Sequence, residues 1–230
     1  MIARIHWVLS LMPYVLLFDV PDAAARGPVC NQRQAVTIWL NAILCQDLAM
    51  HRVVVLVLDG VIPFELGIPS RIFGEATGPG GEPLYEVITC TLGGRPVTSS
   101  AGFTIGVEHD ADALADAGTV VIPPSDALGP AREHGLLPEP VAEALSRIRP
   151  GTRIVSICTA SYVLAAAGLL DDRPATTHWR EAEHFQRTFP RVKVNPGVLF
   201  VDDGDVLTSA GAAAGVDLCL HLVRRDHGSE

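Results

Sequence analysis

The chain has 230 residues, 48% of them hydrophobic, which is enough for one domain with a buried core plus additional segments. Its 17 basic and 26 acidic residues give a formal net charge of −9 without a basic cluster, which argues against a nucleic-acid-binding surface. Five scattered cysteines without a CxxC pair indicate free thiols in a reducing, cytoplasmic compartment, and the eight histidines show no metal-ligand spacing.

The first 49 residues differ from the rest of the chain. Their apolar run, IHWVLSLMPYVLLF at 5–18, is too short to span a bilayer, and its flanks make a poor signal peptide. The first strand-like run begins just after Met50, in MHRVVVLVLDG. We therefore expect 1–49 to be a disordered or non-native extension, with an appended helix pair as the alternative. The folded domain is expected over 50–228, with no membrane contact.

Beyond Met50, strand-like and helix-like runs alternate. In chain order, the predicted elements are a strand at 52–58, a helix at 65–76, a strand at 85–91, a loop at 93–102, a short edge strand at 103–108, a buried strand at 119–123, a helix at 138–148, a strand at 152–158, a helix at 159–168, an amphipathic helix at 179–189, a hairpin at 198–209 and a last helix at 212–225. This alternation predicts an α/β fold whose parallel sheet is covered on both faces. No phosphate-binding glycine motif follows a strand, so we expect no metal and no other cofactor.

Cys158 lies where a β-branched run becomes helix-like, in RIVSICTASYVLAAAGLL at 153–170. A strand that turns directly into a helix lifts the junction residue into the crevice at the carboxyl ends of parallel strands. Free N–H groups and the dipole at the start of the helix stabilise a thiolate, so we expect a pKa below the ordinary value. The alternative is a buried structural cysteine, which is the expectation for Cys90 and Cys219.

Three specific stretches are DGVIPFELGIPSRIFGE at 59–75, SICTASYVLAAAGLLDDRPATTHW at 156–179 and VLFVDDGDVLTSAGAAAGVDLCLHLVRRDHG at 198–228. Through them the chain resembles the ThiJ/PfpI family of class I glutamine-amidotransferase-like domains. Within it, the chain is most similar to the N-terminal domain of AraC-family transcriptional regulators. The resemblance implies a flavodoxin-like three-layer α/β/α sandwich with a mostly parallel sheet, a cysteine nucleophile elbow at Cys158, and a homodimer.

The resemblance also implies that Glu65 occupies an acidic position near the thiol. A protonated Glu65, with its pKa raised by the thiolate, would donate a hydrogen bond to the sulfur and lower the pKa of Cys158. Peptidase-like members carry a histidine after the cysteine, whereas Thr159 here resembles the isonitrile hydratase branch and would orient a water or substrate. His178, in TTHW, is either a ligand-binding residue of the crevice or a residue that packs beside Trp179 after a helix-capping Thr-Thr pair. TSAG at 208–211 is expected to be structural, where the backbone approaches closely.

Two functions fit these residues. The first is a ligand-sensing or interaction domain of the AraC-regulator type, for a small-molecule ligand. No helix-turn-helix pattern follows LVRRDHG in this chain, so we expect no direct DNA binding. The alternative is a small cysteine-dependent enzyme, isonitrile hydratase-like, that adds water with Cys158 as nucleophile and Glu65 and Thr159 in support. The similarity to the AraC-regulator subgroup outside the cysteine elbow favours the ligand-sensing function.

Overall fold

A computed structural model describes residues 50–228, so the predicted extension at 1–49 lies outside the described residues. The strands are β1 His51–Val57, β2 Tyr85–Thr91, β3 Val97–Thr98, β4 Thr104–Ile105, β5 Thr119–Ile122, β6 Arg153–Ile157, β7 Pro174–Ala175, β8 Lys193–Val194, β9 Phe200–Asp203 and β10 Val206–Ser209. The α-helices are α2 Pro63–Phe73, α3 Pro130–His134, α4 Glu139–Ser146, α5 Ser161–Ala166, α6 Ala182–Thr188 and α7 Ala214–His227. Short 3-10 helices are η2 Ala111–Asp116, η3 Cys158–Ala160 and η4 Trp179–Glu181.

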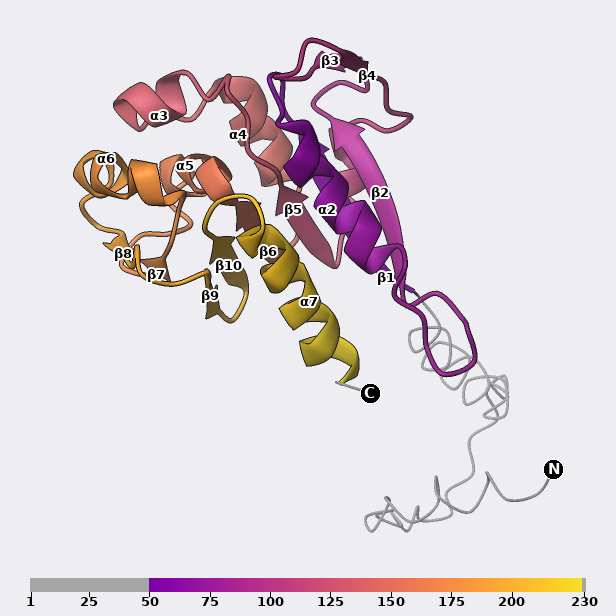
Figure 1. The fold of residues 1–230 in the computed structure, drawn as a ribbon. Coiled ribbons are helices and arrows are strands. Elements are labelled where there is room, and N and C mark those ends of the chain that lie inside the picture. Colours follow the sequence, from indigo (N-terminus) through magenta and orange to yellow (C-terminus); the bar gives the residue numbers. More distant parts are fainter. Residues whose placement is uncertain (1–49, 229–230) are drawn as a thin grey trace, which may run out of the picture. The chain divides into compact units, whose positions relative to one another are not determined.

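Six strands form the central sheet in the order β2-β1-β5-β6-β10-β9 (Figure 1). All neighbours pair in parallel except β9 and β10, which pair antiparallel through the predicted Asp-Gly hairpin. A parallel sheet places the carboxyl ends of β1, β5, β6 and β10 at one edge of the fold, where ligand crevices form. The predicted α/β architecture with a mostly parallel sheet is confirmed.

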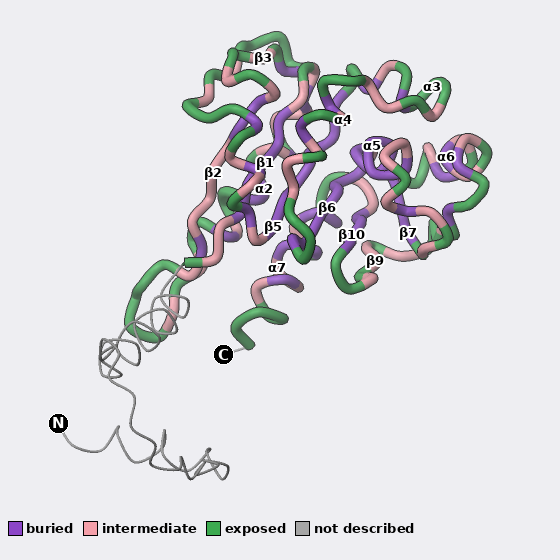
Figure 2. The backbone as a smooth tube through the Cα atoms, turned by 180° about the vertical axis from the view of Figure 1, so that it is seen from behind, coloured by how far each residue is buried: buried purple, intermediate pink, exposed green. Residues whose placement is uncertain are grey.

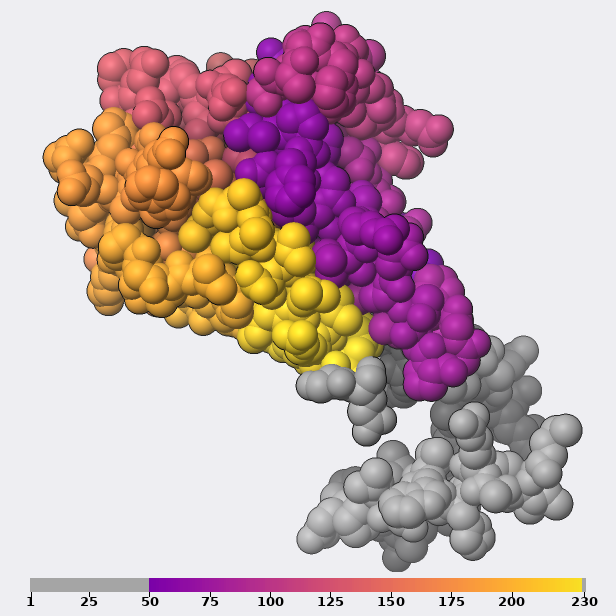
Figure 3. Space-filling view, in the orientation of Figure 1, coloured from indigo at the N-terminus to yellow at the C-terminus, as the bar shows by residue number. Residues whose placement is uncertain are grey.

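Burial on both faces explains why β1 is a continuous apolar run. Successive side chains of a strand alternate between the faces, and Val53 to Val57 are all fully buried. One face packs on α2 and α7, which lie side by side in indigo and yellow in Figure 3. The opposite face carries a larger apolar cluster that includes residues of α4, α5 and α6.

The short strand predicted at 103–108 is present, but it does not lie at the edge of the central sheet. β4 covers Thr104–Ile105 and pairs antiparallel with β3 in a separate two-stranded sheet, inside and beside the predicted loop at 93–102. The Ser99 N–H donates to the Phe103 carbonyl at 2.8 Å and closes this small hairpin. Local pairing of the two short segments therefore replaces pairing with the main sheet.

Candidate functional site

Cys158 sits in a sharp turn from strand to helix at the carboxyl end of β6. The turn gives Cys158 a φ of 59°, in the left-handed region that residues other than glycine rarely adopt. Two buried hydroxyls, of Ser161 and Thr177, lie 2.7 Å from each other and 3.2 and 3.4 Å from the Cys158 carbonyl oxygen. Unusual backbone conformations that the surroundings hold in this way collect at functional sites.

The sulfur of Cys158 is buried, with 4% of the residue exposed. Burial raises the pKa of the Cys158 thiol, and the carboxylate of Glu65 adds to this rise. Backbone N–H groups of Thr159 and Ala212 and the Thr159 side chain hydrogen-bond to the sulfur and lower the pKa in part. The expectation of a lowered pKa was therefore wrong, because the loss of water around the sulfur outweighs the donors.

Glu65 is the third residue of α2 and is 5% exposed, although helix-start acids usually face water. Burial raises the pKa of Glu65, and the nearby charge of Asp126 raises it further, while His178 lowers it. The predicted direction is thus confirmed, with burial as the main cause. The predicted hydrogen bond from Glu65 to the sulfur was wrong: none joins them among residues 50–228, and the Glu65 carboxylate raises the pKa of Cys158 instead of lowering it.

The side chain of His178 itself caps a helix, a role that the sequence analysis gave to the two threonines before it. Its Nδ1 accepts from the Arg180 N–H at 3.2 Å and so caps η4. Its half-buried ring also lies close enough to Glu65 to affect the pKa of that carboxyl. A Cβ placed on Gly211 would lie 2.5 Å from Cδ2 of His178, which agrees with the expected structural role of TSAG.

The segment between β10 and α7 contributes a group to the site that the sequence reasoning missed. Ala212 has a φ of 44° and directs its N–H to the Cys158 sulfur. The backbone N–H groups of Thr159 and Ala212 therefore both favour the thiolate form of Cys158. The small residues around Ala212 were the available signal, but a backbone donor has no side-chain signature.

The four predicted site residues come from three parts of the chain and meet at the carboxyl edge of the sheet. Glu65 begins α2, Cys158 and Thr159 form η3, and His178 precedes η4. Burial raises the pKa of both Glu65 and Cys158. The arrangement therefore gathers a carboxyl, a thiol, a hydroxyl and an imidazole, which together offer hydrogen-bond donors and acceptors.

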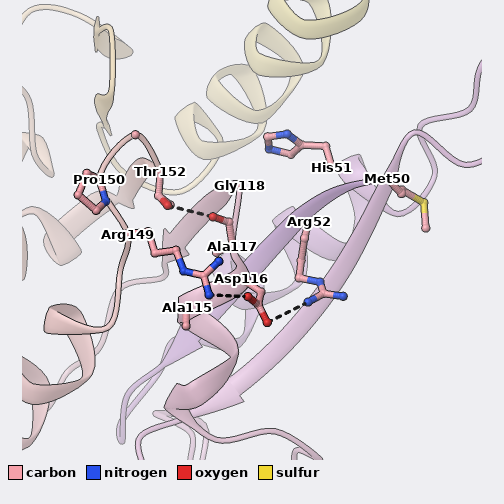
Figure 4. Close-up of a pocket in the computed structure, with 11 residues that line it drawn as sticks. Met50, His51, Arg52, Ala115, Asp116, Ala117, Gly118, Arg149, Pro150 and Thr152 are labelled. Atoms are coloured by element: carbon pink, nitrogen blue, oxygen red, sulfur yellow. Dashed lines mark hydrogen bonds and ion pairs between the residues drawn. The ribbon is translucent and has the colours of Figure 1, made fainter. Parts of the chain in front are cut away.

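A different cavity, of about 580 Å³, lies at the opposite end of the strands (Figure 4). It is lined by the amino end of β1, the segment before β5 and the segment before β6. Asp116 bridges Arg149 at 3.1 Å and Arg52 at 3.9 Å across it. Because ligand crevices of such sheets form at the carboxyl ends of the strands, we place the candidate site at Cys158 and not here.

No three His, Cys, Asp or Glu side chains among residues 50–228 gather in a way that would hold a metal ion. No helix in that range has the length and apolar character needed to cross a membrane.

The model of the DJ-1/PfpI family matches residues 51–225. An uncharacterized Streptomyces lividans protein from the cpoL 5' region is 40% identical over 61% of this chain and 96% of its own length. The transcriptional regulator GbdR of Pseudomonas aeruginosa is 34% identical over 76% of this chain, which spans 46% of GbdR, about half. Isonitrile hydratase of Pseudomonas putida is 31% identical over 56% of this chain and 54% of its own.

Among solved structures, an AraC family transcriptional regulator from Pseudomonas putida has a TM-score of 0.63. The alignment covers 78% of this chain and 94% of that chain at 20% identity. At this identity the likeness shows a shared fold. The fold agrees with the α/β architecture described above.

Proposed function

Because the chain belongs to the DJ-1/PfpI family, we propose that it is a ligand-sensing domain of the AraC-regulator type. The greater identity to GbdR than to isonitrile hydratase, over more of this chain, supports this choice. A small molecule would bind at the carboxyl edge of the sheet, against Cys158, Thr159, Glu65 and His178. Its net charge of −9 supports the further proposal that this chain does not contact DNA directly.

The observation that carries this proposal is the 34% identity to the regulator GbdR over 76% of this chain, and the raised pKa of the Cys158 thiol agrees with it. A thiolate is the nucleophilic form of cysteine, and a buried neutral thiol attacks slowly at neutral pH. The same surroundings suit binding, because they bring hydrogen-bond donors and acceptors from several elements together. Phe64 and Trp179, which are 61% and 63% exposed, adjoin Glu65 and His178 in the chain and supply apolar area beside the polar groups.

Thermal-shift measurements with a panel of small polar metabolites test ligand sensing. A ligand that binds the native state raises the melting temperature of the wild type. Glu65→Gln and His178→Ala should each reduce that rise, because both side chains belong to the site. Glu139→Gln, at an exposed glutamate that begins α4, is the matched control and should leave the rise unchanged. A ligand whose effect persists in both site variants would contradict the proposed location.

The alternative function, isonitrile hydration, is favoured by one observation: the Thr159 hydroxyl and two N–H groups contact the nucleophile candidate. Incubation with cyclohexyl isonitrile, followed by NMR for N-cyclohexylformamide, distinguishes the two functions. Ligand sensing without turnover predicts no product above the protein-free rate. Product formed by the wild type and lost in Cys158→Ala would replace the sensing proposal with the enzymatic one.

We further propose that residues 50–228 are an independent domain that forms a homodimer in the cytoplasm. The family match over 51–225 supports these boundaries, and the resemblance to the family supports the dimer. A variant that begins at Met50 should keep its melting temperature within a few degrees. Sedimentation velocity should show it at twice its monomer mass. A large loss of stability, or a monomer at micromolar concentration, would contradict these proposals.

A further inference from the structure

β2 is an edge strand of the central sheet; an isolated parallel bridge joins its Cys90 to His109 on the outer side, and 85–89 has no strand partner there within residues 50–228. Its N–H at Thr91 donates to the His109 carbonyl at 3.2 Å, on the side away from β1. Since N–H groups alternate along a strand, those of Thr89 and Val87 point to the same outer side. Within residues 50–228, no hydrogen bond takes up these two N–H groups. Figure 2 shows the middle of β2 as half-buried, in pink.

Two hollows flank this open stretch, one on each face of the sheet. On the α2 face, a hollow of about 420 Å³ is lined largely by small and apolar residues, among them Leu66, Gly67 and Val87, although Glu108 and His109 line it as well. On the η2 face, a hollow of about 720 Å³ is lined by many carboxylates, namely Glu86, Glu108, Asp110, Asp112 and Asp116. An added strand would therefore meet an apolar wall on one side and an acidic wall on the other.

The hollow on the η2 face, called the acidic hollow from here on, has more carboxylates than arginine partners and therefore carries a net negative charge. Three carboxylates have arginine partners, and the pairs join Glu86 to Arg52, Asp112 to Arg147 and Asp116 to Arg149. Asp110 accepts from the Asp112 N–H at 3.0 Å, and Glu108 is exposed. The field in this hollow consequently favours a cationic side chain.

We propose that β2 binds an extended basic peptide segment of a partner protein, which adds as a further strand beside 85–89. Its alternate side chains would be apolar toward α2 and lysine or arginine toward Glu108 and Asp110, because successive side chains of a strand face opposite sides. Backbone hydrogen bonds would form with Val87 and Thr89. Pairing of β2 with a second copy of this chain is disfavoured, because it would bring two acidic hollows together.

Binding of the labelled peptide acetyl-KVKVKVK-amide, measured by fluorescence anisotropy, tests this proposal. Acetyl-EVEVEVE-amide has the opposite charge, and acetyl-KKKKVVV-amide has lysines and valines in separate blocks instead of alternating. Both control peptides should bind at least about fivefold more weakly than acetyl-KVKVKVK-amide. Val87→Pro removes the outward N–H without removing a bond to β1, and should weaken KVKVKVK binding about fivefold, as expected for one lost hydrogen bond.

A second pair of variants tests the acidic wall. Glu108→Lys with Asp110→Lys should weaken binding about tenfold or more, and this test stands even if Val87→Pro does not fold, which circular dichroism reports. Glu139→Lys, far along the chain in α4, should leave peptide binding unchanged. Equal binding of the block and alternating peptides, or a Val87-dependent dimer in sedimentation, would overturn the proposal.

Discussion

The C-terminal end of α7 is fastened to the amino edge of the sheet by a buried ion pair. Arg153, the first residue of β6, donates to Asp226 of α7 through Nη1 at 2.8 Å and Nη2 at 2.7 Å. The Tyr85 hydroxyl, from the start of β2, donates to the same carboxylate at 2.9 Å. We expect Asp226→Ala to be among the more destabilising single substitutions in this domain.

The magnitude follows from what the substitution leaves behind. Arg153 is 9% exposed, and without Asp226 its guanidinium keeps Thr119 as a hydrogen-bond acceptor, at 3.0 Å from Nε. Removing one partner of a buried pair costs about 3–5 kcal/mol, and the 20% exposure of the Asp226 side chain places the expectation near 3 kcal/mol. For a domain of this size that corresponds to a loss of roughly 6–12 °C in melting temperature.

Urea unfolding followed by circular dichroism measures the free energy of unfolding. Asp217→Ala is the matched control: it is exposed in the first turn of the same helix, where loss of an acid costs about 0.3–1 kcal/mol. Replacing the whole pair, as Arg153→Met with Asp226→Leu, should recover much of the loss because no buried charge is left unpaired. A loss below about 1 kcal/mol for Asp226→Ala would refute the reasoning.

The pair also has a pH signature. Burial by itself would raise the pKa of Asp226, but hydrogen bonds from Arg153 and Tyr85 hold it below its ordinary value. A carboxyl with a lowered pKa in the folded state stabilises that state above the unfolded pKa, and this stability is lost as pH falls through the folded pKa. The difference between wild type and Asp226→Ala should therefore be constant near neutral pH and shrink below about pH 4.

Two further predictions concern the candidate site. Cys158 should react with iodoacetamide before Cys90 and Cys219, because those two are fully buried and burial raises their pKa to about 12. Labelling of the native protein is followed by mass spectrometry from pH 7 to 10, and the rate of Cys158 labelling should still be rising at pH 10. Equal labelling rates for the three thiols would contradict this prediction. Gly211→Ala should lower the melting temperature by several degrees and alter the rate of Cys158 labelling. The reason is that the new Cβ would lie 2.5 Å from His178 Cδ2, which costs about 1–3 kcal/mol of stability. An unchanged melting temperature and labelling rate would count against the close packing of this loop.

The sequence by itself determined the layered α/β fold and the position of the thiol. Continuous apolar runs such as 53–57 mark strands covered on both faces, whatever their neighbours are. The abrupt change from β-branched to helix-forming residues at Cys158 likewise located the strand-to-helix turn, which is a local property of the chain. Asp-Gly at 203–204 marked the hairpin between β9 and β10.

Only the tertiary structure decided the chemistry of that thiol. The pKa of Cys158 depends on how much water reaches the sulfur and on a backbone N–H from Ala212, and neither has a signature in the local sequence. The same holds for the pairing of β3 with β4, which the loop composition concealed. Burial and contacts between distant segments arise only when the elements pack together. The sequence therefore indicates at which element a titratable group lies, but not how strongly its surroundings shift its pKa.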